Sequence, residues 1–253
     1  MPNASRMGRR AVFLDFDDTL HDFSLAYRGA LLRAVAPVCR AADPPLAPEA
    51  IADRCNAAWA EIWERFVAGE IAEERLWADR NACVLELAGV APDPALAQAV
   101  HTGYLDGMDM GLRLYPETAE ALGLLWDARP RPVVGLLTNG PAVGQRARLE
   151  RLGLAGHFHP VVISGELGFA KPDPRIFATA LEQAGVAPNG AVMIGDNPVA
   201  DVAGARRAGM RAIWLNRGGR PWPRDAGPAP EAVCRDLSAA VRQALQWLGG
   251  SPV

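Results

Sequence analysis

The chain has no excess of positive charge. Its 253 residues carry 26 basic and 29 acidic side chains, which gives a formal net charge of -3. The arginines are scattered, apart from a short cluster at Arg9 and Arg10 in an amino-terminal tail. Proteins that bind nucleic acids or anionic membranes present a basic surface instead. We therefore expect no nucleic acid polymer and no membrane among the partners of this protein.

Long apolar runs are also missing. No stretch approaches the ~20 consecutive apolar residues of a membrane span, and the run after Arg10 is too short for a signal peptide. The expected location is therefore the cytoplasm. Hydrophobic residues make up 50% of the chain and charged residues 22%, which is typical of a globular protein with a sizeable core. The length fits one large domain or a core domain with a smaller companion.

Metal-binding patterns of cysteine and histidine are absent as well. The cysteines lie far apart and form no CxxC pair, at Cys39, Cys55, Cys83 and Cys234. This disfavours structural zinc and predicts reduced, mostly buried thiols. The histidines form no HExxH pattern, and we expect His157 and His159 at the surface or at an edge of the fold.

The most informative stretch that is present is 11–20, AVFLDFDDTL. Four apolar residues run directly into polar ones, as in a buried strand that ends at a ligand site of an open α/β sheet. Asp15 and Asp17 are two apart, so in a continuing strand their side chains leave the same face. Like charges that close require a cation between them or a proton on one. The alternative for this stretch alone is an acidic turn that caps a helix.

Two patterns of apolar residues follow this stretch. Between residues 21 and 110 apolar residues recur at helical spacing and no strand pattern interrupts them, which predicts an all-helical subdomain. Its core is expected to contain Trp59, Trp63 and Trp77. Residues 1–20 and 111–253 instead alternate apolar runs with helical segments, with strands predicted at 11–14, 133–137, 161–163, 191–194 and 212–215 and a closing helix at 231–248. This predicts an α/β fold with a Rossmann-like parallel sheet and helices on both faces.

Polar clusters follow three of these strands and would meet at one edge of the sheet. Asp15 and Asp196 are hard oxygen ligands suited to octahedral Mg²⁺. An anion cradle is predicted from Thr138, the amides of Asn139 and Gly140, and the helix that opens at Pro141. Lys171, on a loop at the same end, adds a positive charge. Together these groups describe a phosphoryl group held for in-line attack.

Four motifs resemble those of the haloacid dehalogenase superfamily, specifically its phosphatase branch with a helical cap of the first type. In chain order they are DFDDT (15–19), TNG (138–140), Lys171 within KPDP, and GDNPVAD (195–201). The resemblance covers residues 11 to about 219. It implies a Rossmann-like core domain at 1–20 and 111–253 and a helical cap subdomain at 21–110.

The resemblance also implies a role for each matching residue. Asp15 would be the nucleophile that becomes an aspartyl-phosphate, and it would ligate Mg²⁺. Asp17 would protonate the leaving oxygen and then accept a proton from water, with its carbonyl facing the metal. Metal coordination would keep Asp15 ionised, whereas cap closure would desolvate Asp17 and favour its protonated form.

The remaining matching residues fall into three groups. The phosphoryl oxygens would be held by Thr138, Asn139, Gly140 and Lys171. Asp196 would be the third metal contact. The supporting residues would be Thr19, Asn197 and Asp201, and the sequence leaves open whether Asp201 joins the metal shell through water or steadies Lys171.

The implied function is a Mg²⁺-dependent phosphatase that acts on a small phosphorylated metabolite, with nucleotides and sugar phosphates as the leading substrates. We expect a monomer or homodimer. A sugar phosphomutase shares all four motifs and stays open as an alternative. A 2-haloacid dehalogenase is disfavoured because it lacks the carboxylate that Asp17 supplies. A non-enzymatic phosphoacceptor or binding protein is a further alternative, although a response-regulator receiver would be half this length and no catalytic position is substituted here.

Overall fold

The structure, a computed structural model, describes residues 8–249, and these form two compact units. The core unit contains the described residues up to His21 together with those from Leu114 onwards, and the helical unit is Asp22–Arg113. Each unit has hydrophobic clusters of its own. The assignment of a cap subdomain to 21–110 stays a prediction, because compactness alone does not reveal what a unit covers.

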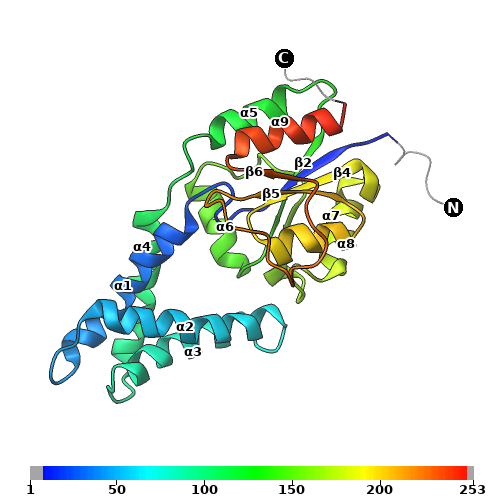
Figure 1. Cartoon of the computed structure of the whole chain (residues 1–253). Coiled ribbons are helices and arrows are strands. Elements are labelled where there is room, and N and C mark those ends of the chain that lie inside the picture. The colour runs from blue at the N-terminus through cyan, green and yellow to red at the C-terminus, as the bar shows by residue number, and fades with distance from the viewer. Residues whose placement is uncertain (1–7, 250–253) are drawn as a thin grey trace. The chain divides into compact units, whose positions relative to one another are not determined.

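A six-stranded sheet forms the centre of the core unit (Figure 1). The strands are β1 (Ala11–Leu14), β2 (Val133–Thr138), β3 (Val161–Ile163), β4 (Ala191–Gly195), β5 (Arg211–Leu215) and β6 (Ala232–Cys234). All pair in parallel, in the order β3-β2-β1-β4-β5-β6. The predicted α/β class with a Rossmann-like parallel sheet is therefore confirmed.

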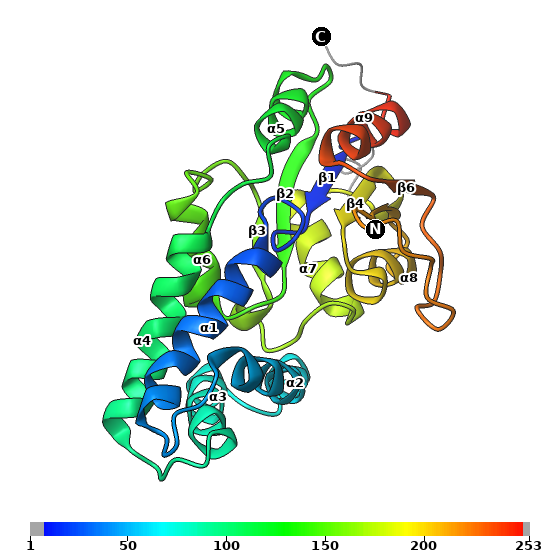
Figure 2. The same ribbon diagram turned by 60° about the vertical axis from the view of Figure 1, so that its left-hand side comes forward.

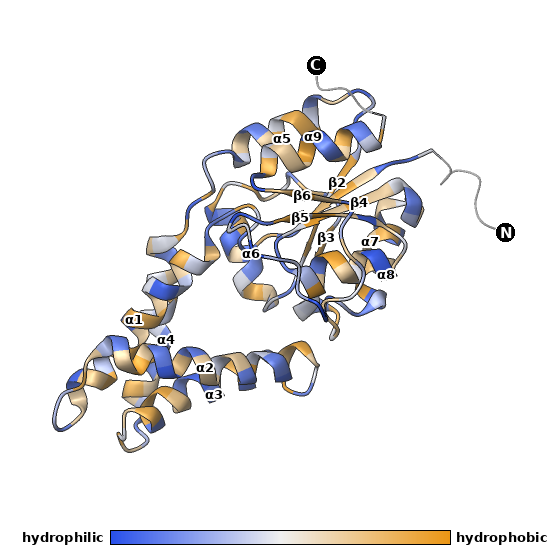
Figure 3. Cartoon of the chain, in the orientation of Figure 1, coloured by the Kyte–Doolittle hydropathy of each residue, from blue (hydrophilic) through white to orange (hydrophobic). Residues whose placement is uncertain are grey.

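The sheet is buried on both faces because β1 alternates between two hydrophobic clusters. Val12 and Leu14 pack in the cluster that contains α5 (Thr118–Asp127) and α9 (Leu237–Trp247), which lie side by side in Figure 1. Ala11 and Phe13 pack in the opposite cluster with α7 (Pro174–Ala184) and α8 (Gly204–Arg207). This two-sided burial explains the unbroken apolar run of the strand. In Figure 3 the strands are mostly hydrophobic, whereas the helices carry both hydrophobic and hydrophilic stripes.

The helical unit consists of α1 (Phe23–Ala41), α2 (Pro48–Val67), α3 (Glu73–Leu87) and α4 (Pro94–Gly111). Figures 1 and 2 show α1 beside α4 and α2 beside α3. Trp59 is buried in the cluster between these helices, and Trp77 packs against that cluster. Trp63 is half-buried and contacts Phe66 instead, so the expected tryptophan core holds for two of the three residues.

The carboxyl end of the core unit differs from the predicted closing helix at 231–248. Residues 232–234 form the short strand β6, and α9 begins only after Asp236, whose side chain accepts a hydrogen bond from the Ala239 N–H at 2.7 Å. Glu231 connects this segment to β5, since its Oε2 accepts a hydrogen bond from the Ala212 N–H at 2.9 Å. Three residues carry too little periodicity to be recognised as a strand.

The structure shows which of the cysteines and histidines are buried. All four cysteines are free, with Cys39 and Cys55 buried and Cys83 and Cys234 half-buried. His157 and His159 are exposed, as expected. Among the helices of residues 8–249, none combines the length and apolar composition that crossing a bilayer requires. A cytoplasmic location stays a prediction.

Small residues allow α1 and α4 to approach closely. Gly103, Gly107 and Gly111 recur every fourth residue on the face of α4 that meets α1. A Cβ built on Gly107 would lie 2.4 Å from Cα of Ala30, and one on Gly111 would lie 2.6 Å from Cα of Ala26. Real Cβ atoms do not approach a backbone so closely, so a side chain at these positions forces the two helices apart.

We expect Gly107→Ala to lower the free energy of unfolding by about 1–3 kcal/mol, the usual cost of overpacking. Gly29→Ala is the matched control, because Gly29 lies within α1 and a Cβ there meets nothing within 4 Å. That variant should be neutral or stabilising by up to about 1 kcal/mol. Urea unfolding followed by circular dichroism measures both. Equal stability of the two variants would contradict the packing argument.

Candidate active site

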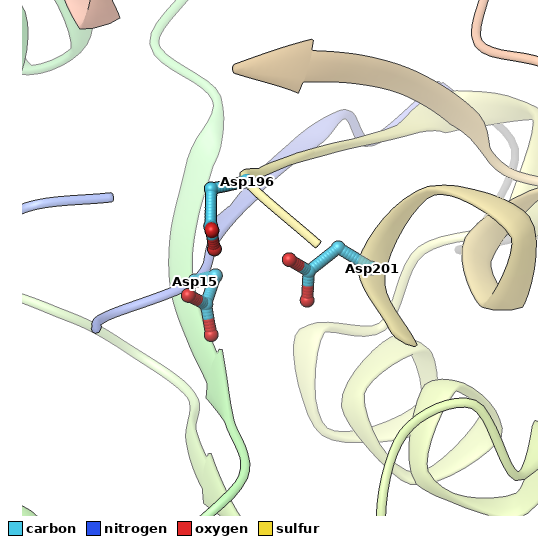
Figure 4. A group of neighbouring side chains, drawn as sticks. All are labelled: Asp15, Asp196 and Asp201. Carbon is cyan, nitrogen blue, oxygen red and sulfur yellow. The ribbon is translucent and has the colours of Figure 1, made fainter. Parts of the chain in front are cut away.

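Three carboxylates gather where the strand order reverses. β1 lies between β2 and β4, and this switch point of an open α/β sheet is where ligands bind. Asp15 follows β1, Asp196 follows β4, and Asp201 lies on η4 (Pro198–Ala203). Their side chains point toward one another (Figure 4), with one carboxylate oxygen of each within 4.8 Å of the others. The predicted convergence of the first and last motifs is thus present in the structure.

Lys171 lies against this cluster and is almost completely buried. Its Nζ donates hydrogen bonds to Asp15 Oδ1 at 2.6 Å, to Asp201 Oδ1 at 2.6 Å and to the Leu137 carbonyl at 2.7 Å. All three ammonium protons are therefore used. Burial acts to lower the pKa of Lys171, but the two carboxylates outweigh it and raise the pKa above its ordinary value. Of the two roles left open for Asp201, contact with Lys171 is present directly.

The cluster carries more negative charge than Lys171 balances. Burial and neighbouring carboxylates raise the pKa of Asp15 to about 7, although Lys171 acts in the opposite direction. Burial, Asp201 and Asp15 raise the pKa of Asp196 to about 8. With all three carboxylates ionised the single ammonium would leave two negative charges, and oxygen donors so close together suit a hard divalent cation. The residues present therefore fit Mg²⁺.

The chain after β4 is shaped to bring Asp201 to this cluster. A Cβ built on Gly195 would lie 2.3 Å from Asp201 Oδ2, so only glycine leaves room for that carboxylate. η4 is a widened π-helical turn, a form found often at functional sites. The side chain of Asn197 accepts from the N–H groups of Val199 and Ala200 and so caps this turn, while its main-chain N–H donates to Asp201 Oδ2 at 2.9 Å.

Two further predicted residues hold the cluster in place. The hydroxyl of Thr19 donates to Asp15 Oδ2 at 3.3 Å, so each oxygen of Asp15 has a partner. The side chain of Asn139 clamps the main chain of Lys171: its Nδ2 donates to the Lys171 carbonyl at 2.9 Å and its Oδ1 accepts from the Lys171 N–H at 2.8 Å. The Asn139 side-chain amide thus positions the lysine.

The predicted anion cradle is only partly available. Thr138 is fully buried at the end of β2, and its Oγ1 accepts from Gln145 Nε2 at 3.0 Å. The Gly140 N–H donates to Ser164 Oγ at 2.9 Å. The Gly140 amide therefore holds the loop after β3, whereas the sequence predicted that it faces a phosphate. The reason is tertiary: Ser164 lies on the neighbouring strand end and is invisible in the local motif.

Asp17 belongs to a separate hydrogen-bonded network. Its carboxylate accepts from His21 Nε2 at 2.8 Å, from Gln145 Nε2 at 3.0 Å and from Arg148 Nη2 at 3.2 Å. Burial acts to raise the pKa of Asp17, but Arg148 and the hydrogen bonds from His21 and Gln145 outweigh it and lower the pKa. This arrangement of the core unit therefore favours the ionised form. Protonation on cap closure stays a prediction.

Sequence reasoning did not identify Gln145, Arg148 or His21. Gln145 is fully buried and joins Asp17 to Thr138, while its Oε1 accepts from Arg148 Nη2 at 2.7 Å. Gln145 and Arg148 are three apart on α6 (Ala142–Arg151), the helix that opens directly after the TNG motif. The carboxyl edge of the sheet, where the carboxylates meet, is called the active edge below. The available signal was a pair of polar residues one turn apart on the first turns of a helix that starts at this edge.

The chain is similar to known proteins in both sequence and structure. Residues 9–209 match the family model of haloacid dehalogenase-like hydrolases. A phosphoserine phosphatase of Thermus thermophilus is 43% identical over 175 residues, which cover 66% of this chain and 67% of that protein. A glyceraldehyde 3-phosphate phosphatase of Methanopyrus kandleri is 34% identical over 223 residues, covering 83% and 84%. The solved structure of a HAD-hydrolase from Bacillus subtilis bound to magnesium shares the fold, with a TM-score of 0.73 at 22% identity over 95% of this chain and 99% of that one.

We expect Arg148→Leu to destabilise the core unit at pH 7 by more than the ~0–1 kcal/mol of a surface pair and less than the ~3–5 kcal/mol of a fully buried one. Because Asp17 has a folded-state pKa below its unfolded value, the contribution of this pair is complete above the unfolded pKa and is lost as the pH falls through the folded pKa. The difference between wild type and variant should therefore shrink below about pH 4.

The measurement is urea unfolding between pH 3 and 7, with Arg146→Leu as control. Arg146 lies on the same helix but is 54% exposed and pairs with Glu166. A pH-independent difference between wild type and Arg148→Leu would show that Arg148 acts only through packing.

Proposed function

Because this chain belongs to the family of haloacid dehalogenase-like hydrolases and is a phosphatase of that family, we propose that it hydrolyses phosphate monoesters of small metabolites through an aspartyl-phosphate at Asp15. The observation that carries this proposal is the meeting of Asp15, Lys171, Asp196 and Asp201 at the switch point of the sheet.

The metal site of the proposal is built from Asp15 and Asp196, with Asp201 beside them and the main-chain carbonyl of Asp17 as a further oxygen donor. The close approach of three carboxylate oxygens and the raised pKa values of Asp15 and Asp196 support a divalent cation there. When bound, Mg²⁺ stabilises the negative charge that the phosphoryl oxygens carry in the transition state.

Asp15 is the nucleophile in this scheme. Its Oδ1 and Oδ2 are held by Lys171 and Thr19, so the carboxylate is fixed before the substrate arrives. Attack on phosphorus forms the bond to an Asp15 oxygen as the ester oxygen leaves. Lys171 then exchanges its hydrogen bond to Asp15 for one to a phosphoryl oxygen, while Asp201 and Leu137 keep the ammonium in place.

Asp17 moves the protons. It donates one to the leaving ester oxygen and accepts one from the water that hydrolyses the aspartyl-phosphate. The ionised state supported by Arg148, His21 and Gln145 is the one needed in the second step. For the first step Asp17 must carry a proton, and a weaker contact with Arg148 would favour that form.

The substrate of the proposal is a small phosphorylated metabolite, such as a nucleotide or sugar phosphate. The relatives described above are named for phosphoserine and glyceraldehyde 3-phosphate, two small phosphate monoesters, which supports this class. A phosphomutase on the same scaffold is the second candidate, since it would use the same carboxylates. Asp17 argues against carbon–halogen cleavage, which needs no acid at this position.

The proposal is tested by turnover of a panel of nucleoside monophosphates, hexose phosphates and phosphoamino acids, ranked by kcat/KM. Asp15→Asn should abolish turnover of every substrate, because an amide cannot accept the phosphoryl group. Asp236→Asn is the control: it makes the same charge change at an exposed helix cap, where asparagine caps equally well. Retained activity of Asp15→Asn would remove Asp15 as nucleophile, and transfer of phosphate to a second hydroxyl of the substrate would favour the mutase.

Mg²⁺ should also stabilise the fold, because it binds only where the carboxylates are assembled. A hundredfold excess over its Kd should raise the free energy of unfolding of the wild type by about 2.7 kcal/mol. In Asp196→Asn the rise at the same Mg²⁺ concentration should be smaller, whereas Asp236→Asn should respond as the wild type does. Thermal unfolding with and without EDTA measures this. Equal stabilisation of Asp196→Asn would place the metal elsewhere.

A further inference from the structure

A pocket lies at the amino ends of the strands, opposite the edge that carries the carboxylates. It has a volume of about 600 Å³ and is lined by residues just before β1 and β2 and at the end of α7, including Arg9, Arg10, Arg131, His159 and Gln183. β1 has four residues at about 3.3 Å each, so it separates Arg10 from Asp15 at its other end. This arginine pocket is therefore distinct from the site described above.

The pocket is rich in positive charge that no carboxylate balances. Three of its ten lining residues are arginines, and none is Asp or Glu. Arg10 and Arg131 form no ion pair with any carboxylate of residues 8–249. By contrast, Arg146, Arg175 and Arg242 each pair with a neighbouring carboxylate at 2.6–2.7 Å.

The sheet itself forces these charges together. Ala11 pairs with Val133, and the Val133 N–H donates to the Arg10 carbonyl at 2.8 Å, so the residues before the two strands are neighbours. Arg10 and Arg131 line the same pocket, and like charges that share a site are unfavourable unless an opposite charge joins them. Arg9 has a structural reason to be there: its Nη1 would lie 3.3 Å from a Cβ on Gly185, at the end of α7, a helix with no basic residue in its last turn. Within residues 8–249 the side chains of Arg10 and Arg131 form neither an ion pair nor a hydrogen bond.

We propose that the arginine pocket is a second binding site, which takes a small phosphate compound with two or more negative charges. Guanidinium groups bind phosphate oxygens bidentately, and two or three of them match such a charge. The volume lies within the ~300–1,000 Å³ of small-molecule sites, and Pro130, Pro132 and Val133 supply apolar walls. A nucleic acid would need an extended basic surface, which a net charge of -3 does not offer. This proposal does not depend on the proposed function.

The test is calorimetric titration of the full chain with inorganic pyrophosphate in EDTA at 150 mM salt. Without a divalent ion the three carboxylates of the active edge repel anions, so binding reports on the arginine pocket. We expect the double variant Arg10→Ser with Arg131→Ser to weaken pyrophosphate binding at least tenfold. The matched control is Arg220→Ser with Arg224→Ser, which removes the same charge from an exposed loop of the core unit and should change the Kd less than twofold.

Three outcomes would overturn the proposal. The first is no binding of pyrophosphate to the wild type at millimolar concentration. The second is equal weakening by both double variants, which would reflect net charge alone. The third is tighter binding of a single-stranded oligonucleotide than of pyrophosphate, lost in the Arg10 and Arg131 variant, which would assign the pocket to a polymer.

Discussion

The arrangement of the active edge depends on one ammonium group. The 26 basic residues of this chain comprise one lysine and 25 arginines, and the lysine is the one buried between Asp15 and Asp201. An ammonium is a compact charge with three donors, and here these reach two carboxylates and the Leu137 carbonyl at 2.6–2.7 Å. A planar guanidinium does not fit such a convergent set of acceptors. Removal of this charge would leave three carboxylates facing one another without any cation of the chain.

The fold explains why such distant residues meet at this lysine. β1 is flanked by β2 and β4, so residues that follow these three strands share one edge, although Asp15 is more than a hundred positions from Asn139 and Asp196 in sequence. Asn139, which follows β2, holds the main chain of Lys171 through two hydrogen bonds, and Gly195, at the end of β4, leaves the space that Asp201 fills. The sheet order and a few short contacts therefore fix the position of the charges before any ligand binds.

Sequence reasoning reached the fold class and the first five strands because these rest on local signals. Apolar runs such as 11–14 are buried on both faces and end in polar residues, so their period and length identify them. β6 was missed because Glu231 and the neighbouring strand β5 create it, and no pattern within three residues reveals that. The partners of Asp17 were missed for the same reason, since Gln145 and Arg148 come from a helix more than 120 positions away. Local patterns predict which residues reach the edge, but only the tertiary structure determines which of them pair.

The surroundings of the two carboxylates of the first motif shift their pKa values in opposite directions. Asp15 shares a buried cluster with two other carboxylates, which raises its pKa to about 7, whereas Arg148 and its neighbours lower the pKa of Asp17. In the proposed mechanism the nucleophile Asp15 must be ionised and the general acid Asp17 must carry a proton, so each group needs one change before the first step. A cation beside Asp15 lowers its pKa by direct attraction. For Asp17 the largest influence against burial is Arg148, so a weaker contact with this guanidinium would favour the protonated form. In the proposed mechanism the helix α6, which carries Arg148, would therefore influence when Asp17 can act as the acid.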